Sequence, residues 1–146
     1  MKKLLLTLII TVAAYAGHVQ HYPFISAATA AAGAVQTDLI LSNAFNGHAS
    51  NIQVQGQGIV IKILSDDNDG SRHQRFIIRL DSGQTILIAH NIDLAPRVSS
   101  LSEGDAVEFN GEYEWNPKGG VVHWTHRDPV NHHSAGWLKH NGQVFQ

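Results

Sequence analysis

The chain has 146 residues, with ten lysine and arginine residues, twelve aspartate and glutamate residues, and a formal net charge of −2. This length predicts one domain, and the charge excludes a global basic field of the kind that attracts nucleic acid. The chain has no cysteine, so it forms neither a disulfide nor a thiolate metal site, and a transition metal would have to bind to nitrogen and oxygen ligands.

The N-terminus has the pattern of a secretory signal peptide. Two lysines precede an apolar run, and the run ends in the small-x-small pattern Ala14-Tyr15-Ala16. A membrane span needs about 20 apolar residues, and this run ends at Gly17 before it reaches that length. We therefore expect residues 1–16 to be a signal peptide that is cleaved after Ala16, which leaves a periplasmic or secreted protein without a stable membrane span.

Residues 17–51 are expected to form a spacer and a short helix. The alanine-rich part up to Val35 has no clean apolar period, which indicates either a spacer or a weak helix packed on the domain. From Gln36 to Phe45, apolar residues recur at helical spacing and predict a short amphipathic helix. Its apolar face is expected to comprise Leu39, Ile40, Ala44 and Phe45.

From Ile52 onward the apolar period changes to two, which is typical of strands. Turn-forming residues separate five such segments, VQGQGIVIKIL, HQRFIIRL, QTILIAH, AVEFNGEY and VVHWTH. This pattern predicts a mainly β fold, with a five-stranded Greek-key barrel of the OB type over residues 52–146 and a His-rich C-terminal segment. The alternative is another small β-barrel or a sandwich. The expected core includes Val60, Ile61, Ile63, Phe76, Ile78, Leu87, Val107 and Phe109.

Several long polar motifs occur in order from Gln53 onward: DDNDGSRHQRFI, LIAHNIDLAPR, GEYEWNPKGG, HWTHRDP and GWLKHNG. In these motifs the chain resembles the DUF3465 family of small exported bacterial proteins. The resemblance implies a bacterial exported domain of OB-like fold, without an established activity. Where the family usually has a second histidine after HWTH, this chain has Arg127, while His123, His126 and Asp128 match.

The stretch VVHWTHRDPVNHHSAGWLKH contains five histidines and suggests a metal site. On a strand, His123 and His126 would point to opposite faces, so a shared site requires the strand to end near Thr125. A parallel pairing of the third and fifth strands would bring His90 close to His126, and an antiparallel pairing would separate them. Zinc and copper(II) accept imidazole and carboxylate ligands. The predicted metal ligands are His123, His126, Asp128 and His90, with His73 as a substitute for His90.

Other readings of the histidines stay open. A histidine that bonds to a buried backbone carbonyl is an ordinary structural use of the residue, and this applies equally to His123 and His126. The adjacent His132 and His133 are expected to be accessory residues of an exposed loop, because neighbours on an extended chain point apart.

A second candidate site is the face of the second and third strands, on which OB barrels usually bind ligands. Cationic and aromatic side chains on such a face suit single-stranded nucleic acid or a sugar, and the alternative is an exposed strand face that carries charge. The expected ligand-binding residues are His73, Arg75, Arg79, His90, Asp93, Trp115 and Trp124.

These observations predict an exported OB-like binding module with a His-rich polar site, which binds zinc or copper(II) and a small or polymeric ligand that is polyanionic or a glycan. The first alternative is a metal-dependent hydrolase of phosphodiester or glycan substrates, since histidine and aspartate ligands can activate water on a metal. No nucleophile motif such as GxSxG accompanies them. The second alternative is a structural interaction protein of the cell envelope.

Overall fold

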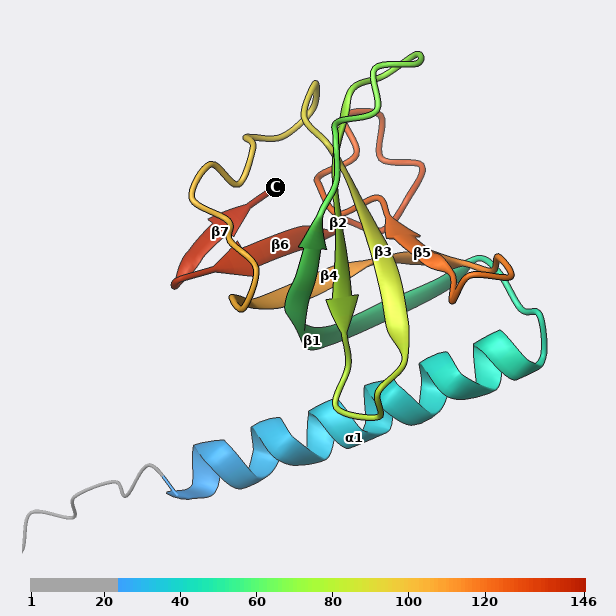
Figure 1. Ribbon diagram of the computed structural model, residues 1–146, viewed down its shortest axis with the longest axis vertical. Helices are drawn as coiled ribbons and strands as arrows, with labels where there is room; N and C mark the ends of the chain where they lie inside the picture. Colours follow the sequence, from blue (N-terminus) through green and yellow to red (C-terminus); the bar gives the residue numbers. More distant parts are fainter. Residues whose placement is uncertain (1–23) are drawn as a thin grey trace, which may run out of the picture.

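The computed structural model describes residues 24–146, in which a long helix lies beside a β-barrel (Figure 1). The helix α1 spans Phe24–Asn46. The strands are β1 (Ile52–Ile63), β2 (His73–Arg79), β3 (Thr85–Asn91), β4 (Ala106–Glu114), β5 (Val121–His123), β6 (Trp137–His140) and β7 (Gln143–Phe145). The predicted signal peptide lies outside the described residues. Within residues 24–146, no helix combines the length and the apolar character needed to cross a membrane.

Strands β1 to β5 close into a barrel. β1 pairs antiparallel with β2 and with β4, β2 pairs antiparallel with β3, and β4 pairs antiparallel with β5. The barrel closes through a parallel pairing of β3 with β5, in which Leu87 lies opposite Val121. This arrangement confirms the mainly β fold and the five-stranded OB-like barrel. It also settles the direction of the β3–β5 pairing, which the sequence left open.

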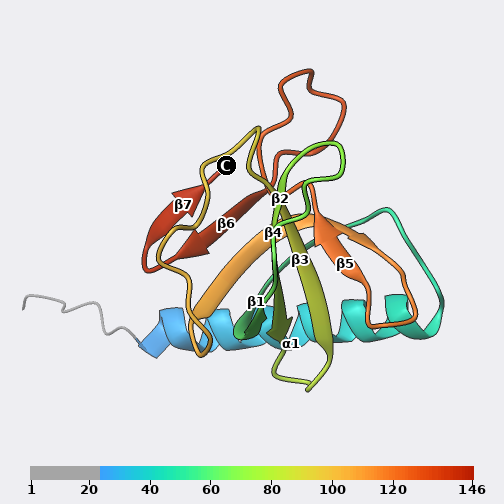
Figure 2. The same cartoon turned by 45° about the horizontal axis from the view of Figure 1, so that its top comes forward.

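Helix α1 runs along one end of the barrel (Figure 2) and packs against β1. From Ala32 onward, the buried residues of the helix are Thr37, Leu41 and Ala44. The Thr37 hydroxyl donates a hydrogen bond to the carbonyl oxygen of Gln55. The strand can approach this closely because it has Gly56, where an added Cβ would meet Thr37 Cγ2 at 2.7 Å. The helix therefore covers one end of the barrel (Figure 2).

The helix differs from the prediction in its length and in its buried face. It begins at Phe24, so the described part of the predicted spacer is helical, which was the second of the two expectations. Of the predicted apolar face, Leu39 and Ile40 are 55% and 38% exposed. The buried residues are Thr37, Leu41 and Ala44 instead, which are spaced by four and three residues and so share one helix face. The sequence did not indicate this face because one of its contact residues is a polar threonine.

The barrel core contains most of the predicted residues. Val60, Phe76, Ile78, Val107 and Phe109 are buried as expected. Three predicted core residues differ: Ile63 is 40% exposed, and Ile61 and Leu87 are only half-buried. Ile61 alternates with the buried Val60 and therefore faces outward, and Ile63 is the last residue of β1, beyond a bulge between Val60 and Lys62. In β3 the inward residues are Ile86 and Ile88, so Leu87 faces outward.

The hairpin of β6 and β7 was not predicted. β6 pairs with β4 at Val107 to Asn110, along the same edge that β5 occupies further on, at Glu112 to Glu114. Leu138 and Phe145 of this hairpin belong to the core. The turn residues Asn141 and Gly142 have φ of 49° and 79°, as a tight hairpin turn requires. The C-terminal segment thus completes the fold, and its histidines are placed by β5, by β6 and by the loop between them.

Candidate functional site

The outer face of β2 and β3 carries a cleft of about 520 Å³. Residues of β2 alternate, so Phe76 and Ile78 point into the core while Arg75 and Ile77 point outward. Ile77 lies opposite Leu87 of β3, and these two aliphatic side chains form part of the cleft lining. The complete lining consists of Leu64, Arg75, Ile77, Thr85, Ile86, Leu87, Asn116, Pro117, Lys118 and Gly120. The cleft is thus mostly apolar and contains two cationic side chains.

The β1–β2 loop positions one of these cations. Arg75 Nε donates a hydrogen bond to the carbonyl oxygen of Ser65 at 3.0 Å, and Arg75 Nη1 lies 3.8 Å from Asp67 Oδ2. The guanidinium is therefore anchored on one side, and its side chain keeps 33% of its surface exposed. A cation held in this way can bind an anion without being ordered first, which lowers the entropic cost of binding.

The β4–β5 turn positions the other cation. The side-chain oxygen of Asn116 accepts hydrogen bonds from the backbone N–H groups of Lys118 and Gly120, at 2.9 and 3.2 Å. Gly120 has a φ of 95°, and an added Cβ there would lie 2.2 Å from the Tyr113 ring. The NPKGG segment therefore forms a fixed turn that presents Lys118 beside the cleft.

Most of the other predicted ligand-binding residues are engaged elsewhere. Arg72 donates hydrogen bonds to Asp93 from its backbone N–H and from Nε, both at 2.7 Å, and these bonds lower the pKa of the Asp93 carboxyl. Trp115 Nε1 donates to the carbonyl oxygen of Phe45 at 3.0 Å, at the end of the helix. Of the predicted set, which also contains His73, Arg79, His90 and Trp124, only Arg75 lines the cleft.

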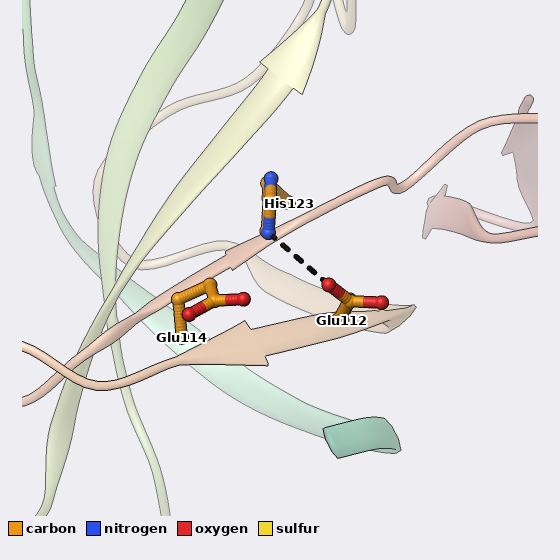
Figure 3. Close-up of side chains that lie close together, drawn as sticks. All are labelled: Glu112, Glu114 and His123. Atoms are coloured by element: carbon orange, nitrogen blue, oxygen red, sulfur yellow. Dashed lines mark ion pairs between the residues drawn. The ribbon is translucent and has the colours of Figure 1, made fainter. Parts of the chain in front are cut away.

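A cluster of Glu112, Glu114 and His123 lies on the outer face of β4 and β5 (Figure 3). Glu112 and His123 are directly opposite each other in the strand register, and Glu114 follows Glu112 on the same face. Their potential ligand atoms all lie within 4.8 Å of one another, with His123 Nε2 at 3.9 Å from Glu112 Oε1. This is the one group of three or more potential metal ligands within that distance in residues 24–146.

His123 carries an unsatisfied nitrogen. Its Nε2 is buried and has no hydrogen-bond partner among the described residues. Burial lowers the pKa of the imidazole, against the raising effect of Glu112 and Glu114. The ring is therefore neutral at neutral pH, and the 3.9 Å contact with Glu112 is not a charged ion pair.

His133 brings a second imidazole to Glu112 from the loop between β5 and β6. Its Nδ1 lies 3.6 Å from Glu112 Oε2, and its ring stacks on Trp124 with centroids 3.8 Å apart and planes at 18°. Trp124 has a φ of 50°, a strained conformation for a residue with a Cβ. Strand β5 thus ends before Thr125, as a site shared by His123 and His126 would require. However, the imidazole that lies beside the cluster is that of His133 and not that of His126.

Asp128 has a structural role in the same loop. Its carboxylate accepts hydrogen bonds from the backbone N–H groups of Val130 and His133, at 3.0 and 2.8 Å. These backbone hydrogen bonds, the one from Val130 most of all, lower the pKa of Asp128. The loop that carries His133 is thus fixed by the aspartate that the sequence suggested as a ligand.

His90 and His126 are buried apart from the cluster. Both ring nitrogens of His90 have partners: Nδ1 lies 2.8 Å from Thr125 Oγ1, and Nε2 lies 3.1 Å from the carbonyl oxygen of Pro96. His126 Nδ1 bonds to the carbonyl oxygen of Arg127 at 2.8 Å. The parallel pairing does bring His90 to the end of β5, but the described residues do not gather the four predicted ligands into one group.

The two glutamates were missed in the sequence. Their signal is the segment GEYEW, in which Glu112 and Glu114 occupy alternate positions of a predicted strand, opposite the core residue Tyr113. Pairing this strand with VVH places His123 beside them. Identifying the cluster therefore required the β4–β5 register, which the sequence did not provide.

The closed barrel, its capping helix and the cleft over β2 and β3 define a small OB-like β-barrel protein. The chain matches the family model DUF3465, described as a protein of unknown function, over residues 24–146 and therefore belongs to that family. No curated protein matches the chain.

Proposed function

We propose that this protein is an exported binding module that holds a polyanionic ligand in the cleft over β2 and β3. The observation that carries the proposal is the lining of the cleft, an aliphatic floor of Ile77 and Leu87 beside the cations Arg75 and Lys118. The cleft also lies where OB-type barrels commonly bind oligomers, on the second and third strands and next to the loop between the fourth and fifth. Charge on the ligand would supply the attraction, and the aliphatic floor would supply contact area.

A polyanion fits this lining better than a neutral glycan does. Sugars and unstacked bases are commonly held by aromatic stacking surfaces, and no aromatic side chain lines the cleft. The two tryptophans expected on this face are committed elsewhere, Trp115 to the helix end and Trp124 to His133. Recognition would then depend on charge, which makes binding sensitive to salt.

Binding is also favoured over hydrolysis. The cleft lining contains no histidine, aspartate or glutamate, the residues that most often act as general acids or bases and as ligands of a catalytic metal. The cluster of Glu112, Glu114 and His123 belongs to other positions of the barrel and is absent from that lining. The side chains of the cleft are therefore better suited to attracting an anionic ligand than to cleaving it.

Export is part of the proposal and rests on the first sixteen residues of the sequence. A binding module released by signal cleavage would act in the periplasm or outside the cell. N-terminal sequencing of the protein from its native host tests this directly. Mature chains should begin near Gly17, and an intact Met1 on protein from the cytoplasm would contradict export.

The binding test is a titration with a short polyanion, such as a sulfated oligosaccharide, against a neutral oligosaccharide of the same length. Arg75→Ala and Lys118→Ala should each lower the affinity for the polyanion by roughly tenfold, since each removes a charge-assisted contact. The control is Lys139→Ala, which removes the same charge from β6, a strand that pairs with β4 and β7 and contributes no residue to the cleft lining. An equal loss of affinity in all three variants would mean that binding depends only on net charge and not on the cleft. That result, or a preference for the neutral oligosaccharide, would overturn the proposal.

A further inference from the structure

We propose that Glu112, Glu114, His123 and His133 bind one divalent transition-metal ion, zinc or copper(II), on the outer face of β4 and β5. This site differs from the cleft in position and in chemistry, because none of the four residues lines the cleft. Three of them are fixed by the strand register, and the fourth comes from the loop between β5 and β6.

The donor atoms around Glu112 lie close to the spacing that a single ion requires. Ligands at about 2.0–2.2 Å from a tetrahedral zinc ion lie roughly 3.3 Å from one another. The two carboxylate oxygens of Glu112 each face one imidazole, with His123 Nε2 at 3.9 Å and His133 Nδ1 at 3.6 Å. Glu114 offers a further oxygen within 4.8 Å of both Glu112 and His123. The two distances to Glu112 are too long for hydrogen bonds and exceed the ligand spacing of a metal by a few tenths of an ångström. Glu114 and His133 would have to move closer to the other donors on binding, since His133 is not part of the group within 4.8 Å.

The unpartnered nitrogen of His123 is an independent sign of a missing ligand. Buried polar atoms in folded proteins nearly always have a partner, so one that lacks a partner calls for an explanation. His123 Nε2 is fully covered, unpaired, and directed toward Glu112, as Figure 3 shows. A bound cation would accept the lone pair of this nitrogen and offset the negative charge of the two glutamates at the same time.

The loop holds His133 ready for this role. Trp124 stacks on the imidazole, and Asp128 accepts the backbone N–H of His133. Asp128 would therefore act as a positioning residue, whereas the sequence suggested it as a ligand. Residues that support the ligands of a metal commonly control its affinity in this way.

The donor set determines the class of metal. Two imidazole nitrogens with carboxylate oxygens suit zinc and copper(II), whereas calcium and magnesium prefer ligand sets made only of oxygen. The absence of cysteine from the chain leaves no thiolate to compete for the ion. Calcium and magnesium should therefore bind much more weakly than zinc.

The test uses the full chain without a histidine tag, stripped of metal and titrated with Zn²⁺ and Cu²⁺ by calorimetry. We expect one ion per chain with a micromolar or lower Kd. Glu112→Gln and His133→Ala should each lower the affinity for zinc at least tenfold. His132 is the exposed neighbour of His133, and His132→Ala should leave the affinity unchanged. Circular dichroism of each variant verifies that the barrel is folded. Because His133 lies in a loop, His133→Ala still tests the site if Glu112→Gln does not fold.

Tryptophan fluorescence gives a second readout. Copper(II) bound at His133 should quench Trp124, because the two rings are stacked. Trp124→Phe should lose most of the quenching and still bind copper(II) by calorimetry, while quenching that persists would locate the ion elsewhere. Zinc binding weaker than micromolar, or equal losses in His132→Ala and His133→Ala, would overturn the proposal. The cleft variant Arg75→Ala should bind zinc with unchanged affinity. The zinc result therefore stands or falls separately from the proposed polyanion binding in the cleft.

Discussion

His90 is a fully buried imidazole at the end of β3, and its surroundings satisfy the neutral ring. The carbonyl oxygen of Pro96 can only accept, so His90 Nε2–H donates to it at 3.1 Å. In the neutral ring, Nδ1 then accepts from the Thr125 hydroxyl at 2.8 Å. Burial is the main cause that lowers the pKa of His90 from 6.5 to about 4, and the nearby His126 lowers it further.

This lowered pKa makes stability depend on pH in a definite direction. Below pH 6.5 the unfolded chain takes up a proton on His90, while the folded chain does so only near pH 4. The unfolded state then binds more protons, so the free energy of unfolding falls as the pH falls through this window. At about 1.4 kcal/mol per pKa unit the full loss is about 3 kcal/mol, of which about 2 kcal/mol falls between pH 7 and pH 5.

The variant His90→Gln tests this magnitude. Its amide can donate to Pro96 and accept from Thr125 but does not titrate, while every other titrating group is retained. Urea unfolding followed by tryptophan fluorescence should show that wild type loses about 2 kcal/mol more than His90→Gln between pH 7 and pH 5. The comparison uses only the pH dependence, so a change in the overall stability of the variant does not affect it. Losses that agree within about 0.5 kcal/mol would refute the reasoning.

Three further substitutions test other parts of the structure. Leu138→Ala should lower the free energy of unfolding by about 2–5 kcal/mol, while the exposed Val144→Ala should change it by less than about 0.5 kcal/mol, and similar values for both would remove β6 from the core. Gly120→Ala adds a Cβ against the Tyr113 ring at a φ of 95°, so we expect a lower melting temperature and weaker polyanion binding, and an unchanged protein would contradict the turn geometry. Asp128→Ala should weaken zinc about tenfold without a large change in melting temperature, and unaltered zinc affinity would deny Asp128 its positioning role.

The sequence predicted the barrel because its strands follow simple alternation. Phe76 and Ile78 against Arg75 and Ile77 show which face of β2 is buried, and such a pattern needs no tertiary information. The core prediction was wrong where it departed from this alternation, at Ile61 next to the buried Val60 and at Leu87 between the buried Ile86 and Ile88. The turn signal of Asn141 and Gly142 was present in the sequence, but the two strands beside it are so short that their period is hard to see.

The candidate sites were harder to predict, because they depend on which strands are neighbours. His123 was named as a ligand from the sequence, but its neighbours Glu112 and Glu114 come from another strand and lie beside it only because of the strand register. His132 and His133 were expected to be accessory together. The structure separates them, with His132 exposed and His133 stacked on Trp124, as their opposite directions along the chain allow. Composition gave the right residue types, and pairing decided which of them meet.

The most direct test of the proposed function is a map of the polyanion contacts by ¹⁵N–¹H correlation spectra of the protein during a titration. We expect the largest chemical-shift changes at backbone amides of the cleft, those of Ile77, Leu87, Lys118 and Gly120, and we expect these changes to saturate together. The amides of β6 and β7 should stay in place. Shifts centred on the β6–β7 hairpin or on the loop of His132, with none in the cleft, would contradict the assignment of the ligand site to β2 and β3.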